Sequence, residues 1–284
     1  MAVDLHCHST ASDGTLSPAS VVALAAEQGV TTLALTDHDT IDGVAEAVHA
    51  GADHGVRVIP GVEISTGTPF GRTMHLIALF ADPDPPGLTR ALTQNRARRD
   101  ERIDLILARL AALGPEISRE RVDAHATGTV ARPHIAAALV EAGHCSSVQD
   151  AMDRYLGDHR PADVPHRGLD GAAAVRLVRE LGGAPIVAHP GTLRLGNTGL
   201  EAYMQSLATV GLVGIEVHRP EHLPGQRDVM RRIARRFGLV ASGGSDFHGP
   251  ESRFRLGDTG EPALPDDAAD VVLSAVGKRV PSLE

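Results

Sequence analysis

The sequence is poor in aromatic residues and cysteine, and it contains no long apolar run. It has no tryptophan, two tyrosines and five phenylalanines, which argues against a surface that stacks on the bases of an extended single strand. Two cysteines, Cys7 and Cys145, are too few for a disulfide framework and fit a reducing compartment. No apolar stretch reaches the roughly 20 residues needed to cross a bilayer. We therefore expect a cytoplasmic protein without a membrane partner.

The charge balance is acidic, since 27 Lys and Arg residues stand against 36 Asp and Glu residues and give a net charge of −9. This sign is wrong for a protein that holds a DNA duplex by bulk electrostatics. A specific phosphate pocket is compatible with it, because local cations can oppose the net field. Hydrophobic residues make up 42% of the 284 residues, enough for a buried core, so the composition excludes a disordered chain.

Seven short apolar runs rich in β-branched residues recur along the chain, and most of them are joined through a helical pattern. They predict strands at residues 3–5, 31–36, 56–60, 72–80, 185–188, 214–217 and 239–242. Helices are expected at residues 18–28, 41–54, 88–113, 133–142, 148–155, 172–181, 200–210 and 226–237. Strands that alternate with helices predict an α/β fold with a parallel sheet, from which we infer a barrel.

The interval between the fourth and fifth predicted strands is too long for one crossover. His6 and His38, at the ends of the first two strands, are 32 residues apart, whereas His75 and His189 are 114 residues apart. Subtracting one ordinary strand–helix unit leaves an insertion of roughly 80 residues. We therefore expect a barrel formed by residues 1–85 and 168–284, with a mainly helical, substrate-capping domain of residues 86–167 inserted into it.

Six histidines and three carboxylates accompany the predicted strands. They are His6, His8, Asp13, His38, Glu63, His75, His189, Asp246 and His248. All except His75 follow a strand, and in a parallel barrel the carboxyl ends of the strands meet on one rim. Imidazoles and carboxylates in this number are the ligands of a multinuclear metal centre. Nine ligands exceed what one ion needs, so we expect two or three divalent ions, with Glu63 as a bridging carboxylate.

The spacing of these residues supports a shared pocket. In an extended chain residues i and i+2 point to the same side, so His6 and His8 face one way and Cys7 the other. We expect Cys7 to pack in the core rather than to bind metal. His218 follows the sixth predicted strand, and the sequence leaves open whether it faces the pocket or ends the strand. The ligand types suit manganese, iron and zinc alike, and manganese is our first expectation.

The motifs DLHCHS, LTDHDT, PGVEIS, HLIALF, AHPG and GSDFH follow one another between Asp4 and His248. Together they resemble the PHP family, the polymerase and histidinol phosphatase metal phosphoesterases. The resemblance implies a distorted seven-stranded (β/α) barrel with a helical insertion domain and an active site of two or three metals. It also implies that the nine residues named above are the metal ligands.

The insertion resembles one branch of this family, through the motif ARPH at residues 131–134 and the segment YLG at residues 155–157. That branch hydrolyses nucleoside 3′,5′-bisphosphates and trims short RNA from its 5′ end. The resemblance implies that Arg132 and His134 grip substrate phosphate, and a planar guanidinium can meet two phosphate oxygens at once. Where the branch has a lysine, this chain has His159-Arg160, and we expect Arg160 to supply the positive charge.

A second basic cluster lies on the first predicted helix of the insertion and consists of Arg96, Arg98, Arg99 and Arg102. Acidic residues alternate with these arginines, so the pattern indicates a solvated helix face with intrahelical ion pairs. One or two of the arginines could line a nucleotide groove.

The expected reaction is metal-assisted phosphoester hydrolysis, in which a metal-bound hydroxide attacks phosphorus in line. Arg132 and His134 would neutralise charge on the phosphate oxygens, and His134 and Asp37 are candidates for the proton donor. The best-fitting substrate is a nucleoside 3′,5′-bisphosphate, losing its 3′-phosphate, or a short 5′-phosphorylated RNA.

Two alternatives stay open at this point. The protein could hydrolyse histidinol phosphate or another small phosphomonoester, although the ARPH motif argues against the first. It could instead be a metal-stabilised nucleotide-binding regulator without turnover, against which the complete ligand set argues. A polymerase-associated exonuclease is disfavoured because no polymerase segments follow.

Overall fold

The computed structural model describes residues 2–126, 130–157, 159–165 and 168–276. Its centre is one seven-stranded sheet whose strands lie in sequence order. The strands are β1 (Ala2–Cys7), β2 (Val30–Leu35), β3 (Arg57–Gly67), β4 (Thr73–Leu79), β5 (Ala184–Val187), β6 (Gly214–His218) and β7 (Val240–Gly243). The structure contains a strand at each of the seven predicted places.

The sheet is mixed, because β4 runs antiparallel to both β3 and β5 while the other pairs are parallel. The prediction of a wholly parallel sheet was therefore wrong at this strand. Only residues 68–72 join β3 to β4, and Gly71 adopts a φ of 78° within that turn. A parallel neighbour needs a crossover of roughly a dozen residues. A connection as short as this one therefore forces a hairpin.

The barrel closes between β1 and the segment that follows β7. The backbone N–H of His8 donates to the carbonyl of Phe247 at 2.9 Å, and that of Asp246 donates to the carbonyl of His6 at 2.9 Å. The fold is thus a distorted barrel, as expected. Since His6, His8 and Asp246 are themselves predicted metal ligands, the closing hydrogen bonds also bring ligands from the two ends of the sheet together.

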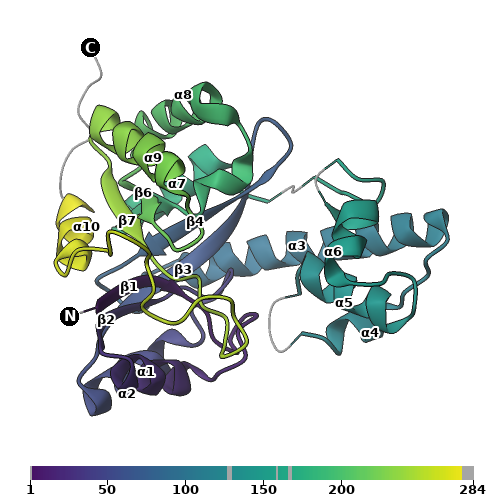
Figure 1. Cartoon of the computed structure of the whole chain (residues 1–284), viewed down its shortest axis with the longest axis horizontal. Coiled ribbons are helices and arrows are strands. Elements are labelled where there is room, and N and C mark those ends of the chain that lie inside the picture. Colours follow the sequence, from purple (N-terminus) through teal and green to yellow (C-terminus); the bar gives the residue numbers. More distant parts are fainter. Residues whose placement is uncertain (1, 127–129, 158, 166–167, 277–284) are drawn as a thin grey trace.

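Helices surround this sheet (Figure 1). They are α1 (Pro18–Glu27), α2 (Val44–His54), α7 (Gly171–Glu180), α8 (Gly196–Ala208), α9 (Pro224–Phe237) and α10 (Ala268–Val276), with a short 3₁₀ turn at Pro190–Leu193. Helix α1 begins as its sequence predicts, because the Ser17 side chain accepts a hydrogen bond from the backbone of Ser20 and Pro18 occupies the first turn. Helix α10 was not predicted. No helix of the described ranges is long and apolar enough to cross a membrane.

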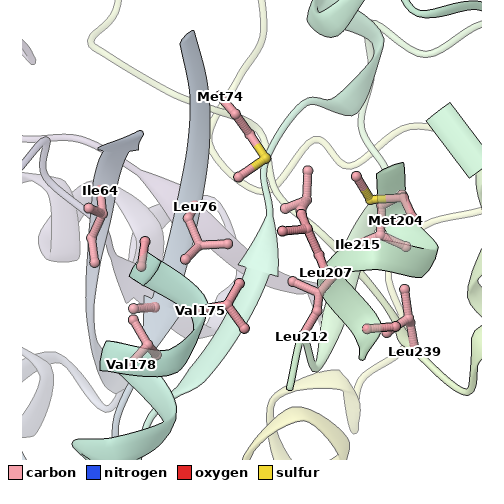
Figure 2. Close-up of a cluster of buried hydrophobic side chains, with 14 of the residues drawn as sticks. Ile64, Met74, Leu76, Val175, Val178, Met204, Leu207, Leu212, Ile215 and Leu239 are labelled. Atoms are coloured by element: carbon pink, nitrogen blue, oxygen red, sulfur yellow. The ribbon is translucent and has the colours of Figure 1, made fainter. Parts of the chain in front are cut away.

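The largest buried cluster lies between the β3–β6 part of the sheet and the helices α7, α8 and α9. Figure 2 shows Leu76 of β4 facing Val175 of α7, with Leu207 of α8 and Ile215 of β6 beside them. These four side chains are at most 1% exposed. Burial of this kind fixes the strands against the helices, and it thereby holds the strand ends that carry the polar residues.

The insertion has a hydrophobic cluster of its own. It comprises α3 (Leu88–Leu113), α4 (Arg119–Asp123), α5 (Arg132–Glu141) and α6 (Val148–Ala151), which continues as a π-helical turn at Met152–Leu156. Ile106 and Leu110 of α3 are buried in the same cluster as Ile135 and Leu139 of α5. Figure 1 shows this unit beside the barrel, to which the long helix α3 connects it. The helix predicted at 148–155 is present but changes to π geometry at Met152, and α4 was not predicted.

Close backbone approach at Gly244 gives a first testable prediction. A Cβ atom at this position would lie 2.4 Å from the Cβ of His6 and 2.5 Å from its backbone nitrogen. We expect Gly244→Ala to lower the free energy of unfolding by about 1–3 kcal/mol, because the strand of His6 must shift. Thermal unfolding followed by circular dichroism measures the effect.

Gly225→Ala is the matched control, since a Cβ there meets nothing within 4 Å. We expect it to leave the melting temperature unchanged or slightly raised, because alanine restricts the unfolded chain. A Gly244→Ala protein as stable as the Gly225→Ala protein would contradict the close approach.

Candidate metal centre

The predicted ligands gather in one pocket at the rim of the barrel. Their ligand atoms form three groups in which all atoms lie within 4.8 Å of one another. The groups are His8, Asp13, His38 and His248; His6, His8, Glu63 and Asp246; and His38, Glu63 and His75. The ninth predicted ligand, His189, places its Nε2 atom 2.8 Å from Oε1 of Glu63. Buried imidazole and carboxylate clusters of this kind are consistent with more than one metal site.

Glu63 lies at the centre of the pocket and is fully buried. Its Oε1 atom is 3.1 Å from Nδ1 of His75 and 2.8 Å from Nε2 of His189. Its Oε2 atom faces the opposite group, with Nδ1 of His38 at 3.0 Å. The two oxygens of one carboxylate therefore face different sets of imidazoles, as a bridging ligand requires. The sequence placed Glu63 after the third strand, but β3 extends to Gly67 and Glu63 lies inside it.

The donor set fits a cation. Three ring nitrogens, those of His6, His8 and His38, lie 3.0–3.3 Å from Oε2 of Glu63. Yet this buried oxygen makes no hydrogen bond to the residues that the structure describes. A buried carboxylate oxygen without a donor is costly unless a positive charge satisfies it. Lone pairs of nitrogen and oxygen that converge in this way can coordinate a shared metal ion, whereas they repel one another without it.

The reversed direction of β4 explains the position of His75. His75 is the third residue of β4 and pairs with Ser65, near the end of β3. The amino-terminal end of an antiparallel strand lies at the same edge as the carboxyl ends of its neighbours. The one predicted ligand that does not follow its strand therefore reaches the same rim.

The pKa shifts of the carboxylates, His38 and His75 are towards the protonation states that metal ligands need. In the absence of a cation the pKa of His6 and that of His248 rise instead, because the carboxylates of Asp246 and Asp13, respectively, outweigh burial. Burial raises the pKa of Glu63, but the surrounding imidazoles, His38 foremost, hold that pKa well below its usual range. Burial of Asp13 is likewise outweighed by His38 and by a hydrogen bond with His248, so its pKa falls well below the ordinary value. Burial lowers the pKa of His38 to about 3 and also lowers that of His75. Charged carboxylates and neutral imidazoles are the forms that coordinate metal.

Glu216 and Arg219 lie directly behind the pocket, and the sequence did not indicate either. Both are almost completely buried. Oε1 of Glu216 is 2.8 Å from Nδ1 of His6, and its Oε2 accepts the backbone N–H of His189 at 2.5 Å. Arg219 donates to Oε2 of Glu216 at 3.3 Å and to Oδ2 of Asp246 at 2.9 Å. The pair thus contacts three predicted ligands from behind, which is how carboxylates orient metal-binding histidines.

One signal for Glu216 was present in the sequence. It lies two residues before His218, which we considered as a pocket residue, and on a regular strand the two would share a face. A register shift between Glu216 and His218 breaks that alternation. As a result His218 turns away, and its Nδ1 atom is 2.9 Å from the carbonyl of Pro262. Cys7 is buried and its thiol donates to the carbonyl of Ala34, in agreement with a packing role.

Asp37 was a candidate proton donor, and its surroundings argue against that role. Its Oδ1 accepts hydrogen bonds from the backbone of Ser9 and the hydroxyl of Ser12, and its Oδ2 accepts from the hydroxyl of Ser9. These three hydrogen bonds occupy both oxygens of Asp37 and hold the loop that leads to Asp13.

A cavity of about 290 Å³ opens directly above the pocket. Asp13, His38, His75 and His248 line its barrel side. Arg99, Arg102 and Arg132 line its insertion side. Positive groups therefore face the predicted metal ligands across a space that an anionic substrate could fill.

The two other predicted phosphate-binding residues occupy different places. His134 is partly buried, and its Nδ1 accepts the backbone N–H of Ala131 at 3.0 Å, so the neutral ring carries its proton on Nε2. Burial lowers the pKa of His134, although the charge of Asp13 opposes this shift. Arg160 does not line the first cavity and lies instead in a neighbouring one, which Arg132 also lines.

The arginine cluster on α3 differs from its prediction. Arg99 is 10% exposed in its side chain and donates to Oδ2 of Asp39 at 2.6 Å and to the hydroxyl of Ser65 at 2.9 Å. Arg102 donates to the carbonyl of Val164 at 2.5 Å. The acidic residues of α3 bind Arg119 of the next helix rather than this cluster. The solvated-face interpretation was wrong for Arg99 and Arg102, because a single helix does not reveal which side meets the barrel.

Comparison with known proteins gives the family. The model of the PHP domain matches residues 4–153, more than half of the chain. The chain belongs to the PHP family.

It is 40% identical over 256 residues to the 5′-3′ exoribonuclease of Haemophilus influenzae, covering 89% of this chain and 92% of that protein. It is 36% identical over 263 residues to the 3′,5′-nucleoside bisphosphate phosphatase of Chromobacterium violaceum, covering 87% of each. The solved structure of an amidohydrolase from Chromobacterium violaceum matches with a TM-score of 0.82 and 34% identity over 97% of both chains.

The match to the PHP domain covers only part of the pocket. Six of the nine predicted ligands, from His6 to His75, lie within residues 4–153, whereas His189, Asp246 and His248 lie beyond them. The PHP barrel of this chain nevertheless brings all nine to one rim. Its last three strands thus complete a pocket that its first four begin.

Proposed function

We propose that this PHP protein is a metal-dependent phosphoester hydrolase that removes the 3′-phosphate of nucleoside 3′,5′-bisphosphates and also trims short 5′-phosphorylated RNA. The observation that carries the proposal is the pocket of nine ligand-type side chains, four of which line a cavity together with Arg99, Arg102 and Arg132. Relatives at 40% and 36% identity are named for these two activities. The two activities are the same reaction if the enzyme breaks the bond between the 3′ oxygen of the first nucleotide and phosphorus.

Two or three divalent cations would occupy the pocket, with manganese as the first expectation and iron or zinc as alternatives. Their ligands would be the nine residues named above, with Glu63 as the bridge. Bound divalent cations of this type neutralise phosphate charge and lower the pKa of water. The burial of Glu63 and the orphaned Oε2 atom support the assignment, because the charge of that oxygen is otherwise unmatched.

The residues of the insertion would hold the substrate. Arg132 lines the first cavity from the start of α5, and its guanidinium would donate hydrogen bonds to two phosphate oxygens. His134 keeps Nε2–H as its donor, because Nδ1 is occupied by the backbone of Ala131. We propose that this N–H donates a hydrogen bond to a phosphate oxygen of the substrate. A proton donor to the leaving 3′ oxygen must be an imidazolium, which the hydrogen bond from Ala131 to Nδ1 disfavours, so His134 is assigned the binding role.

We propose that residues 86–167 act as the substrate-capping domain on a barrel of residues 1–85 and 168–284. The separate hydrophobic cluster of the insertion supports this division. So does the first cavity, since its walls come from both units. Closing such a site excludes water, which strengthens each ionic contact with phosphate.

Release of inorganic phosphate, and for the RNA release of 5′-mononucleotides, by manganese-loaded protein tests the proposal. The panel would contain adenosine 3′,5′-bisphosphate, 5′-AMP, 3′-AMP, histidinol phosphate and a short 5′-phosphorylated RNA. We expect the bisphosphate to be preferred and to yield 5′-AMP. A preference for histidinol phosphate would replace the substrate assignment while keeping the metal centre. Binding without release from any compound would favour a nucleotide-binding regulator instead.

The role of Arg132 gives a prediction of its own. We expect Arg132→Met to lower kcat/KM for the bisphosphate about 10- to 100-fold, because one charge-assisted contact with phosphate is lost. Steady-state kinetics at saturating manganese measure this loss. Arg98→Met is the matched control, since Arg98 is exposed on α3, and we expect it to retain wild-type activity. Equal activity of the two variants would refute the contact.

A further inference from the structure

A second cavity, of about 460 Å³, adjoins the first. Arg132 and Met152 line both cavities, so the two are neighbours that share one wall. His159 and Arg160 line the second cavity from the insertion, and Thr192 and Arg194 line it from the barrel. Of these residues, only Arg132 and Arg160 were expected to contact substrate.

The barrel side of the second cavity is tied to the metal centre. Thr192 belongs to the 3₁₀ turn that begins directly after His189, and Arg194 is the residue that follows this turn. The backbone N–H and the hydroxyl of Thr192 both donate to the carbonyl of His189, at 3.0 and 2.9 Å. The N–H of Arg194 donates to the carbonyl of Gly191 at 3.3 Å. Arg194 is therefore held at a fixed place relative to a predicted metal ligand.

The charge of the second cavity suits an anion. Neither Arg160 nor Arg194 forms an ion pair with any described carboxylate, although the protein carries a net charge of −9. Asp153 also lines the cavity, and its Oδ1 accepts a hydrogen bond from the side chain of Gln149. Arg132 adds a third guanidinium at the shared wall. Among the described residues that line the cavity three arginines stand against one acid. Arg132 also lies 3.9 Å from Oδ1 of Asp163, and the remaining excess of positive charge attracts phosphate.

Left-handed backbone conformations occur at the predicted metal centre and at the second cavity. Five non-glycine residues of the described ranges have a left-handed φ: Asp39, His159, His189, Arg194 and Asp246. His189 and Asp246 are predicted ligands, and Asp39 follows another. The remaining two, with φ of 62° and 49°, both line the second cavity. Such conformations are unfavourable for residues with a side chain and cluster where function requires them.

We propose that the second cavity binds a second phosphate group of the substrate and that Arg194 is the residue that selects for it. This inference rests on the proposed function, because the first phosphate must lie at the metal ligands. Two sources offer the same chemistry: the 5′-phosphate of the reacting nucleotide, or the next phosphodiester of an RNA. Arg194 lines the cavity from the barrel and Arg160 lines it from the insertion, so both units contribute to the recognition of that group.

Matched substrate pairs test Arg194. Adenosine 3′,5′-bisphosphate against 3′-AMP isolates the 5′-phosphate, and the trinucleotide ApApA against the dinucleotide ApA isolates the next phosphodiester. We expect Arg194→Asn to lower kcat/KM about 10- to 100-fold for the member of one pair that carries the extra phosphate, and to leave its partner unchanged. The pair that responds identifies the source. Arg194→Lys should recover part of the loss, since it keeps the charge.

The controls separate the outcomes. Asparagine tolerates the left-handed conformation, so Arg194→Asn is expected to fold, and its thermal unfolding verifies this. Arg232→Met, an exposed arginine on α9, should change neither pair. An equal loss on both members of each pair, or no loss at all, overturns the proposal.

A failure of the proposed function would be distinguishable. If the wild-type protein releases no phosphate from the bisphosphate, calorimetric binding of 5′-AMP against adenosine tests the cavity by itself. Tighter binding of 5′-AMP that disappears in Arg194→Asn would keep the second phosphate site without the reaction. Equal binding of the two compounds would remove the site.

Discussion

Glu63→Gln is expected to abolish phosphate release almost completely. Both oxygens of Glu63 face ligand-type nitrogens, His75 and His189 on one side and His38 on the other. An amide replaces one carboxylate oxygen by a hydrogen-bond donor and removes the negative charge, so the cations that Glu63 would bridge would lose a ligand atom and that charge. A loss of about 4 kcal/mol of transition-state stabilisation corresponds to about a thousandfold in kcat.

Two measurements check this expectation. Elemental analysis of purified protein gives the number of ions per chain, which should fall in Glu63→Gln, and phosphate release at saturating manganese gives kcat. Glu180→Gln, an exposed position at the end of α7, is the control and should match the wild-type protein in both. If Glu63→Gln kept its full complement of ions and its rate, Glu63 would not be a bridging ligand.

Glu216→Gln is expected to weaken metal binding about 10- to 100-fold while leaving the chemistry intact at saturating metal. Glu216 touches no metal position itself, but it fixes the ring of His6 and the backbone of His189. Because Glu216 accepts the Nδ1–H of His6, the Nε2 atom of that ring is free to face the pocket. An amide in place of the carboxylate would put its NH₂ group against His6, His189 or Arg219.

The measurement is calorimetric titration of manganese into metal-free protein, together with the manganese dependence of activity. A positioning role predicts activation at higher manganese concentration and a kcat near that of the wild type. Glu221→Gln is the matched control, because Glu221 also pairs with Arg219 but is 50% exposed and contacts no predicted ligand. Unchanged affinity in Glu216→Gln, with a normal melting temperature, would show that Glu216 does not orient the pocket.

Much of the site could be predicted because it is encoded locally. His6 and His8 lie two residues apart at the end of an apolar strand, and Asp246 and His248 repeat that spacing. The motifs that contain them resemble the PHP family in order as well as in content, and the match to the PHP domain confirms the family. Helix α3, predicted at residues 88–113, is also present with those bounds, since a glycine stands at each end.

The features that were missed depend on contacts between distant segments. Glu216 acquires its role only when the barrel closes, because its carboxylate then reaches His6, 210 residues away in sequence. Arg99 looked solvated because a helical pattern does not say that Asp39 and Ser65 will meet that side. The second cavity likewise forms only where the turn after β5 meets the insertion.

The sequence by itself determined the number of strands, the alternation with helices, the place of the long insertion and the residue types at the strand ends. These follow from periodicity and spacing, which act over a few residues. The direction of β4, the set of imidazoles at each oxygen of Glu63 and the cavity that Arg194 and Arg160 both line could be known from the tertiary structure alone. The reason is physical: chain direction and side-chain encounters are set by turns, register shifts and packing between segments that are remote in sequence.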